Sequence, residues 1–342
     1  MRKVLVTGAN GFIEANVVRA LVAHGEDVRA LVRPGSDRRS LAEVPVELAE
    51  GDLRDAVSVR RAVEGCARVY HVGADYRLWA RNPWELYDTN VRGTMHVLDA
   101  CQAAGVERIV HTSTVGTIGL SALPGACDET TPLAPGQISG PYKRSKLEAE
   151  RVALSWAAKG LPVVVVNPSA PIGPWDAKPT PTGKILVDFA RGRIPAFVDT
   201  GLNVVHVRDV AEGHWLAAER GRPGERYVLG NRNMTLREIL ASLAGLLGCP
   251  APRVRLPYAF AWAAGALSTA TANLVTHRPP AVPLEAVRMS RRRMFVDASR
   301  AVRELGVPQT PVREAFEDAI RWFAERGILP RPDSRSAAWA SR

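Results

Sequence analysis

The chain has few cysteines and no leader segment ahead of its first predicted strand. Its four cysteines are widely spaced among 342 residues and form no C-x-x-C pair, so neither a disulfide framework nor a metal site is expected. The N-terminal sequence MRKVLVTG enters an apolar strand directly and leaves no room for a signal peptide. We therefore expect a protein of the reducing cytoplasm.

Acidic residues are also scarce relative to basic ones. Lys and Arg number 45 against 35 Asp and Glu, which gives a formal net charge of +10. A basic protein can attract phosphates, nucleic acid or an anionic membrane. The positive charge is spread along the chain and no nucleic-acid-binding motif is present. We therefore expect a small-molecule substrate and no nucleic-acid partner. The 46% hydrophobic content suffices for one large or two closely joined domains.

Long hydrophobic runs are nearly absent. Residues 257–275 form the most apolar stretch, and its length is near the minimum for a transmembrane helix. The stretch is rich in Ala, Ser, Thr and Gly instead of Leu and Ile. We expect a packed helix, or a helix resting on a membrane surface, and peripheral membrane contact stays open.

Apolar runs and amphipathic segments alternate through the first half of the chain. The predicted buried strands cover residues 4–7, 28–32, 69–72, 109–112 and 163–166. The predicted helices cover residues 16–24, 56–63, 90–104 and 143–159. This alternation predicts an α/β fold, namely a Rossmann-like doubly wound parallel sheet with helices on both faces.

The alternation ends after residue 167, where residues 168–183 are dense in Pro and Gly and predict a loop beside the sheet edge. Further helices are predicted over residues 185–191, 207–220, 236–247 and 312–326. We expect a dinucleotide-binding domain over residues 1–167, to which residues 204–230 return. A smaller, mostly helical substrate domain is expected over residues 168–203 and 231–330, and residues 331–342 are expected to be a flexible tail.

The first turn lacks one glycine of a nucleotide-binding loop. Gly8 and Gly11 follow the first strand, and a helix begins near Phe12 and Ile13. Such a turn seats the pyrophosphate of a dinucleotide on the N-terminus of the helix. The usual third glycine lets the helix sit close to the strand, and here it is replaced by Glu14. A carboxylate near the phosphates would repel them, so this position predicts weakened cofactor binding.

The end of the second predicted strand lacks an acidic residue. A carboxylate there would hydrogen-bond the ribose 2′-OH and select NAD. The chain instead has Arg33, with Ser36 and Arg38 nearby, which suits the 2′-phosphate of NADP. NADP is therefore the expected cofactor and NAD the alternative. A solvated loop arginine is the competing interpretation.

Tyr142 and Lys146 form the sharpest candidate for chemistry, because they share one face at the start of a predicted helix. An ammonium beside a phenol lowers the pKa of the phenol, which can then exchange protons with a substrate oxygen near neutral pH. The spacing alone is weak evidence, since exposed pairs of this kind are common. The hydroxyls of Thr112, Ser113 and Thr114 end a predicted strand upstream, at the sheet edge where α/β folds bind ligands.

Together these motifs resemble those of the extended short-chain dehydrogenase/reductase family. The resemblance covers nearly the whole chain. It is carried by TGANGFI (7–13), GDL (51–53), HVGAD (71–75), NVRGT (90–94), TST (112–114), YKRSK (142–146), NPSAPIGP (167–174) and VHVRDVAEGH (205–214). Within the family the chain is most similar to hopanoid-associated sugar epimerases, through stretches such as KPTPTGK and FVDTGLN, and more distantly to dihydroflavonol reductases.

The resemblance implies roles for individual residues. Tyr142 would be the general acid/base, Lys146 its partner and Thr114 the catalytic hydroxyl, while Asn90 would support the site through its helix. A homodimer is expected from the resemblance alone. The residues implied in cofactor binding are Gly8, Asn10, Gly11, Phe12, Ile13, Arg33, Asp52, Leu53, Val72, Gly73, Ala74, Thr112, Tyr142, Lys146 and Pro168.

The sequence says less about the substrate. The side chains expected to face the cleft are Ser113, Asn167, Ser169, Thr200, Asn203 and His206. The run RMSRRR over residues 288–293 could hold a nucleotide-sugar diphosphate, and equally could be a solvated face or a membrane-touching patch.

Three functions stay open at this point. The leading hypothesis is a nicotinamide-dependent sugar or nucleotide-sugar epimerase linked to hopanoid biosynthesis. An NADPH-dependent ketone or aldehyde reductase is the alternative, and the motifs do not separate the two because the same Tyr/Lys/hydroxyl set serves both. A dinucleotide-binding protein without turnover is the third, which Glu14 favours modestly and the intact Tyr142 and Lys146 oppose.

Overall fold

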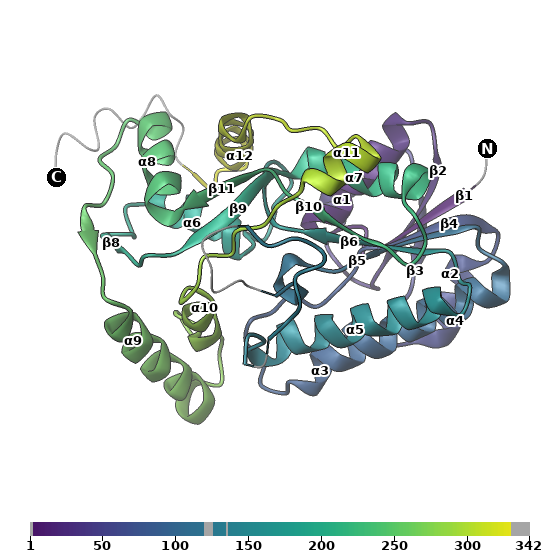
Figure 1. The fold of residues 1–342 in the computed structure, drawn as a ribbon, viewed down its shortest axis with the longest axis horizontal. Helices are drawn as coiled ribbons and strands as arrows, with labels where there is room; N and C mark the ends of the chain where they lie inside the picture. The colour runs from purple at the N-terminus through teal and green to yellow at the C-terminus, as the bar shows by residue number, and fades with distance from the viewer. Residues whose placement is uncertain (1–2, 120–125, 135, 330–342) are drawn as a thin grey trace.

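The computed structural model describes residues 3–119, 126–134 and 136–329. At its centre is a seven-stranded parallel sheet in the order β10-β6-β5-β4-β1-β2-β3 (Figure 1). The strands of this sheet are β1 (Lys3–Thr7), β2 (Asp27–Val32), β3 (Glu47–Glu50), β4 (Cys66–His71), β5 (Arg108–Thr112), β6 (Val163–Pro168) and β10 (Arg226–Leu229). The structure confirms the predicted fold class, and every predicted strand is present.

Helices cover both faces of the sheet (Figure 1). One face packs against α1 (Phe12–Ala23), α7 (Val207–Arg220) and α11 (Ser299–Leu305). The other packs against α2 (Ala56–Val63), α4 (Gly93–Ala104) and α5 (Gly140–Ala158). All six residues of β6 are buried, as expected of a strand covered on both sides. The segment after β9 (Gly201–His206) returns to the sheet through α7 and β10, whereas the division into domains stays a prediction.

The remaining described residues form a second apolar core beside the carboxyl ends of the strands. The small strands are β7 (Ala170–Ile172), β9 (Gly201–His206) and β11 (Arg232–Thr235) in one sheet, and β8 (Ala196–Phe197) and β12 (Val254–Arg255) in another. The helices are α6 (Pro181–Ala190), α8 (Leu236–Leu247), α9 (Tyr258–Thr271), α10 (Leu284–Met289) and α12 (Val312–Glu325). This part is mostly helical, as the sequence indicated, and two small sheets join its loops.

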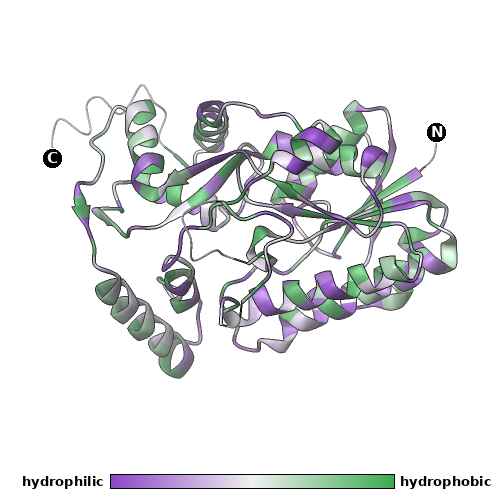
Figure 2. Cartoon of the chain, viewed as in Figure 1, coloured by the Kyte–Doolittle hydropathy of each residue, from purple (hydrophilic) through white to green (hydrophobic). Residues whose placement is uncertain are grey.

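The apolar stretch at 257–275 forms α9, which continues into a π-helical turn, η4 (Ala272–Thr276). Figure 2 shows that this arm is largely hydrophobic along its length. Within the described ranges, no helix is both long enough and apolar enough to cross a bilayer. The predicted tail, residues 331–342, lies outside the described residues.

Candidate active site

The glycine turn after β1 packs directly against the turn after β4. Gly8 has φ +68°, and a Cβ on Gly8 would lie 2.6 Å from Cα of Gly73. Oγ1 of Thr7 accepts a hydrogen bond from N–H of Gly73 at 3.1 Å and lies 2.9 Å from Nδ1 of His71. Burial lowers the pKa of His71 to about 3, so this imidazole is neutral. Only glycine at position 8 allows the two backbones to approach this closely.

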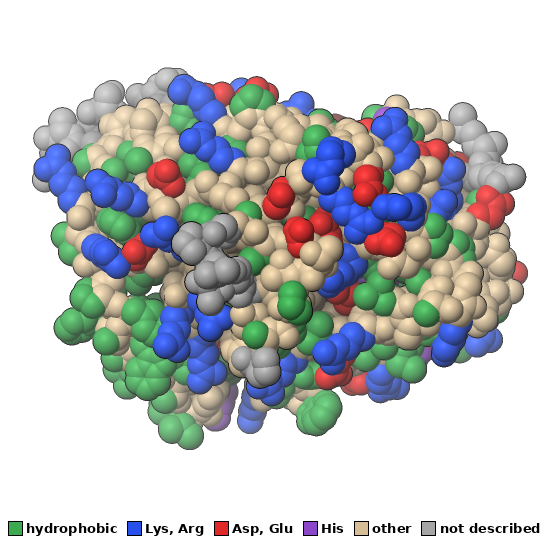
Figure 3. Space-filling model, viewed as in Figure 1, with side chains coloured by type: hydrophobic (Ala, Val, Ile, Leu, Met, Phe, Trp, Pro, Cys, Tyr) green, Lys and Arg blue, Asp and Glu red, His purple; other side chains and the backbone are tan. Residues whose placement is uncertain are grey.

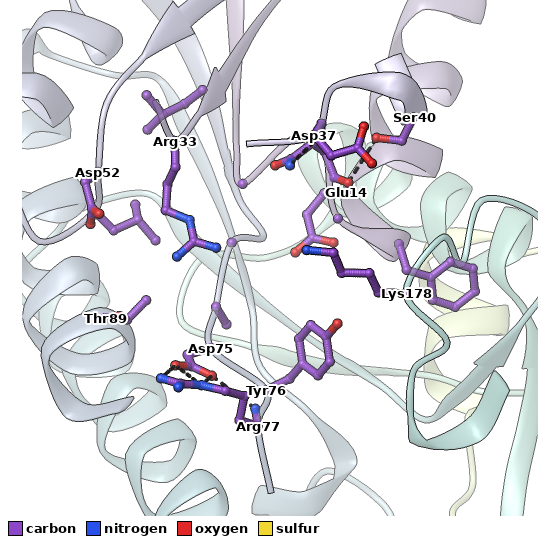
Figure 4. A pocket seen from close by; sticks show the side chains of 18 of the residues that line it. Glu14, Arg33, Asp37, Ser40, Asp52, Asp75, Tyr76, Arg77, Thr89 and Lys178 are labelled. Carbon is purple, nitrogen blue, oxygen red and sulfur yellow. Dashed lines mark hydrogen bonds and ion pairs between the residues drawn. The ribbon is translucent and has the colours of Figure 1, made fainter. Parts of the chain in front are cut away.

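The two turns border a cavity of about 560 Å³ at the carboxyl ends of the central strands, a size typical of ligand sites (Figure 4). Of the residues assigned to the cofactor, the lining contains Gly8, Asn10, Gly11, Phe12, Arg33, Asp52, Leu53, Gly73 and Ala74. The other assigned residues, Ile13, Val72, Thr112, Tyr142, Lys146 and Pro168, are not part of this lining.

Arg33 follows β2, and its side chain points into this cavity (Figure 4). Asp52 lies on the same side of the cavity. The pKa of Asp52 is lowered mainly by its hydrogen bond from Arg54, with a smaller contribution from the charge of Arg33. Arg38, expected near a 2′-phosphate, instead forms an ion pair with Glu50 and does not line the cavity. Of Arg33 and Arg38, Arg33 is therefore the one whose side chain faces the cavity.

Hydrogen bonds tie the loop that carries Arg33 to the glycine turn. Nδ2 of Asn10 donates to the carbonyl oxygen of Asp37 at 2.9 Å, and Oγ of Ser40 donates to the carbonyl oxygen of Asn10 at 3.0 Å. Asn10 is thus hydrogen-bonded to Asp37 and Ser40 of the loop after β2. These bonds hold the loop at the mouth of the cavity.

Glu14 occupies the first turn of α1, three residues after the N-cap Gly11. Its side chain folds back over the glycine turn. A Cβ on Gly11 would lie 2.2 Å from Oε2 of Glu14, and a Cβ on Gly8 would lie 3.7 Å from Oε1. The backbone N–H of Glu14, a group that the start of a helix leaves unpaired, acts on this carboxyl by lowering its pKa. A carboxyl group of the protein therefore lies where folds of this kind seat a phosphate.

The position of Glu14 changes its protonation. Burial raises the pKa of its carboxyl to about 7, against the opposing effects of the backbone hydrogen bond and of the Lys146 charge. The group therefore switches between neutral and charged forms close to physiological pH.

Tyr142 and Thr114 come together at the end of β5, where the Thr114 hydroxyl acts to lower the pKa of the Tyr142 phenol. Tyr142 lies in the first turn of α5, after Pro141. Thr114 caps the short helical turn η3 (Val115–Thr117), and its Oγ1 accepts a hydrogen bond from N–H of Gly116 at 3.1 Å. Ser113 is buried, with its Oγ 3.4 Å from Oγ1 of Thr117. The hydroxyl beside Tyr142 therefore belongs to Thr114.

The expected lowering of the Tyr142 pKa by Lys146 is not found. Nζ of Lys146 donates to the carbonyl oxygen of Thr112 at 2.7 Å, and burial lowers the pKa of this lysine to about 8. The pKa of Tyr142 is raised to about 12, first by burial and then by the charges of Glu14 and Asp75, against the lowering effect of the Thr114 hydroxyl. The phenol is therefore protonated at neutral pH.

Asn90 joins the loop after β4 to the helix that carries Tyr142. It lies buried in a π-helical turn, η2 (Asp88–Arg92), which follows α3 (Trp84–Tyr87). Its Oδ1 accepts from N–H of Asp75 at 2.7 Å, while its Nδ2 donates to the carbonyl oxygen of Asp75 and to Oγ of Ser145, both at 2.9 Å. Oγ of Ser145 donates in turn to the carbonyl oxygen of Tyr142 at 2.8 Å. Asn90 is therefore a positioning residue.

Most side chains expected to face the substrate are engaged inside the fold. Asn167 donates to Oε2 of Glu150 at 2.8 Å. Asn203 donates to Oδ1 of Asn233 at 2.9 Å. His206 caps α7 through N–H of Arg208 and lies 3.2 Å from Oδ2 of Asp318. Protein groups therefore hold these three side chains, and their contact with a substrate stays a prediction.

Two further residues expected to contact the substrate, Thr200 and Ser169, differ in their surroundings. Thr200 donates to the carbonyl oxygen of Arg292 at 3.3 Å, in an exposed position. Oγ of Ser169 is buried and has no hydrogen-bond partner among the described residues. Neither residue lines the large cavity.

A second cavity, of about 370 Å³, adjoins the N-terminus of α5. Nε1 of Trp79 donates to Oδ1 of Asn273 at 2.8 Å and so joins the loop before α3 to η4 at its edge. Much of the lining is apolar, namely Leu78, Trp79, Ala80, Pro83, Pro141, Pro283 and Leu284. Gly140 and Pro141, the first two residues of α5, are part of the lining. This cavity therefore lies next to the helical turn that carries Tyr142.

Several residues of the large cavity were not identified from the sequence. Tyr76 and Arg77 come from the loop after β4, and Lys178 comes from the Pro/Gly-rich loop after β6 (Figure 4). The loop itself was expected beside the sheet edge, but the sequence did not single out Lys178 within it. Trp175 of this loop has φ +75°, and the guanidinium carbon of Arg19 lies 3.6 Å from its ring centre.

A family model described as the NAD-dependent epimerase/dehydratase family matches residues 4–230. The chain belongs to this family. It is 44% identical over 332 residues to a putative dihydroflavonol 4-reductase of Synechocystis, covering 95% of each chain. It is 40% identical over 326 residues to sterol demethylase protein B of Methylococcus capsulatus, covering 95% of this chain and 99% of the relative. The crystal structure of gox2253 matches with a TM-score of 0.86 at 43% identity, over 96% of this chain and 100% of that one.

Membership in this family makes the protein an NAD(P)-dependent enzyme of the extended short-chain dehydrogenase/reductase type. The residues present fit the adenosine end of such a dinucleotide better than its diphosphate. The cavity beside Arg33, Asp52 and Leu53 suits an adenosine end. The glycine turn suits a diphosphate once the Glu14 carboxylate has rotated away or taken up a proton.

Proposed function

We propose that the protein is an NADP(H)-dependent dehydrogenase or reductase that interconverts a ketone and a secondary alcohol on a largely apolar substrate. The observation that carries the proposal is the proximity of the Tyr142 and Thr114 side chains, next to a mainly apolar cavity. The names of the two relatives, which refer to a dihydroflavonol and a sterol, support a substrate with a large hydrocarbon surface.

The chemistry follows from the protonation states. A bound nicotinamide supplies or accepts the hydride. The Tyr142 hydroxyl, with its pKa near 12, is the proton donor for the carbonyl oxygen during reduction, while the Thr114 hydroxyl hydrogen-bonds the same oxygen. Lys146 lies one helical turn beyond Tyr142 and is held by the carbonyl oxygen of Thr112. This contact fixes the turn of α5 that follows Tyr142 against the end of β5.

The direct test follows NADPH absorbance during incubation with a steroid ketone, with equimolar formation of the alcohol as the expected result. Purified protein that carries tightly bound cofactor, and that converts substrate without consuming NADPH, would overturn the reductase proposal.

One observation favours a second candidate, sugar epimerisation. Arg288 lines the cavity beside α5 and could pair with a diphosphate. Incubation with UDP-glucose separates the two candidates, because an epimerase forms UDP-galactose with no net change in NADPH. The link to hopanoid biosynthesis stays a prediction from the sequence.

The preference for NADP is tested at Arg33. An arginine–phosphate contact contributes about 1.5–3 kcal/mol, so Arg33→Ser is expected to weaken NADPH binding by about 10- to 100-fold. NADH has no 2′-phosphate, and its affinity is expected to change little. Fluorescence titration of both cofactors measures the effect.

Arg38→Ser is the matched control, because Arg38 pairs with Glu50 and does not line the cavity. This variant is expected to bind both cofactors like the wild type. Equal losses for NADPH and NADH in Arg33→Ser would contradict the assignment, as would a wild-type preference for NADH.

A further inference from the structure

The arm formed by α9 and η4 exposes an apolar stripe. Phe260, Leu267 and Leu274 are 66%, 72% and 79% exposed, and they are spaced by seven residues, so they lie along one side of the arm. Trp262 and Val275 add 46% and 72% exposed surface nearby. Large apolar side chains grouped in this way mark an interaction site on a folded protein.

The opposite side of the arm is already occupied. Gly265 is buried, and a Cβ there would lie 2.9 Å from Cγ2 of Val287 in α10. Ala272, seven residues further, is 2% exposed. Contact with α10 therefore fixes which side of the arm faces outward, and the stripe is a consequence of the fold.

Positive charge surrounds the stripe, and negative charge is missing from it. Residues 254–284 contain no Asp or Glu. Exposed arginines flank the arm at both ends, and others lie in α10 or just after it, namely Arg253, Arg255, Arg278, Arg288, Arg291, Arg292 and Arg293. Two of them, Arg255 and Arg293, share Asp199 as an ion-pair partner. Figure 3 shows hydrophobic side chains gathered over α9 with basic side chains beside them.

We propose that the α9–η4 arm docks the protein on the surface of an anionic lipid bilayer. A helix that lies in a membrane interface needs apolar and aromatic side chains on one side and basic groups that reach anionic headgroups. The arm has both. A water-soluble protein partner would be expected to pair with polar groups as well, and the stripe offers few.

The inner side of the same arm connects the docking surface to the active site. Thr269 and Asn273 line the apolar cavity beside α5, while Phe260, Leu267 and Leu274 are exposed. Docking would therefore place this cavity next to the bilayer. An apolar ketone or alcohol dissolved in the membrane could then be captured without crossing water. This last step rests on the proposed function, whereas docking itself does not.

The test is flotation of the full-length protein with phosphatidylcholine vesicles that contain about 30% phosphatidylserine, an anionic lipid. Wild-type protein is expected to float with these vesicles, less well with pure phosphatidylcholine, and less well at high salt. The triple variant Phe260→Ser/Leu267→Ser/Leu274→Ser is expected to bind at least roughly tenfold more weakly.

A second triple variant, Leu48→Ser/Val57→Ser/Trp84→Ser, removes exposed apolar side chains elsewhere on the molecule and is expected to float like the wild type. Tyr142→Phe is expected to float normally too, which separates failure of docking from failure of the proposed reaction. Absence of wild-type flotation would overturn the proposal, as would equal flotation of the arm variant. A homodimer that only the arm variant dissociates, without vesicle binding, would assign the stripe to contact between two copies.

Discussion

Turnover by the Tyr142→Phe variant is expected to fall by a factor of about 10² to 10⁴, the usual contribution of a positioned proton donor. Phenylalanine keeps the ring and removes only the hydroxyl that lies near Thr114. Dinucleotide affinity is expected to stay nearly unchanged, because Tyr142 does not line the large cavity. Single-turnover rates and a fluorescence titration of NADPH measure the two quantities separately.

Tyr87→Phe controls for loss of a tyrosine hydroxyl, since Tyr87 lies in α3 away from Thr114. It is expected to turn over like the wild type. A parallel series at Thr114 refines the assignment, because Thr114→Ser keeps the hydroxyl and Thr114→Val removes it. Full activity in Tyr142→Phe, or loss of cofactor binding with the fold intact, would show that the proton comes from another group.

The sequence predicted the sheet well where burial imposes a pattern. The strands predicted from apolar runs, such as 163–166, are all present, because both faces of a parallel sheet must be covered. Two strands of the sheet, β3 and β10, were missed. The apolar run of β10 is only three residues long, Tyr227 to Leu229. The β3 sequence ELAE is mostly exposed at the edge of the sheet, so hydrophobicity gives no signal there. The edge position follows from tertiary pairing with β2, which no local pattern encodes.

Prediction of the site was less uniform, because a polar residue near a strand end can serve a ligand or the fold. Thr114 and Tyr142 do meet. Asn203 and His206 looked equally suitable, yet they bond to Asn233 and Asp318, which are distant in sequence. The protonation of Tyr142 was also misjudged. The spacing of Tyr142 and Lys146 placed them on one helix but could not reveal burial or the nearby carboxylates.

Glu14 was recognisable as a departure from the glycine pattern, whereas the direction of its side chain was not. An outward carboxylate would have cost only packing. The structure turns it back onto Gly11, within reach of the backbone N–H at the start of α1. The positive end of the helix favours this arrangement for the same reason that it favours a phosphate. The Glu14 carboxylate therefore competes with the cofactor diphosphate for the glycine turn.

Removing this competitor is expected to tighten dinucleotide binding. Two unit charges about 4 Å apart interact by about 4 kcal/mol near a protein surface. Because the side chain can rotate away at some cost, we expect Glu14→Gly to lower the dissociation constant by about 10- to 100-fold at pH 8. Glu14→Gln keeps the size and removes the charge, so it separates repulsion from crowding. Fluorescence titration with NADH gives the constants.

The raised pKa predicts how this effect depends on pH. With a pKa of about 7, the carboxyl is mostly neutral below that pH and mostly charged above it. Wild-type affinity for NADH is therefore expected to fall as pH rises through 7, whereas that of Glu14→Gln is expected to stay flat. NADH is the appropriate probe because the 2′-phosphate of NADPH would itself titrate near pH 6, as phosphate monoesters do.

Protein stability provides a readout without any ligand. The folded pKa of Glu14 lies above its ordinary value of 4.5, so the native state holds this proton more tightly than the unfolded chain. Its contribution to stability is therefore lost as pH rises from about 4.5 to about 7. Glu14→Gln is expected to melt at a higher temperature than the wild type at pH 8. Glu85→Gln, an exposed change at the edge of the same cavity, controls for loss of a carboxylate. Equal dissociation constants for wild type and Glu14→Gly across this range would show that the carboxylate leaves the site at no cost.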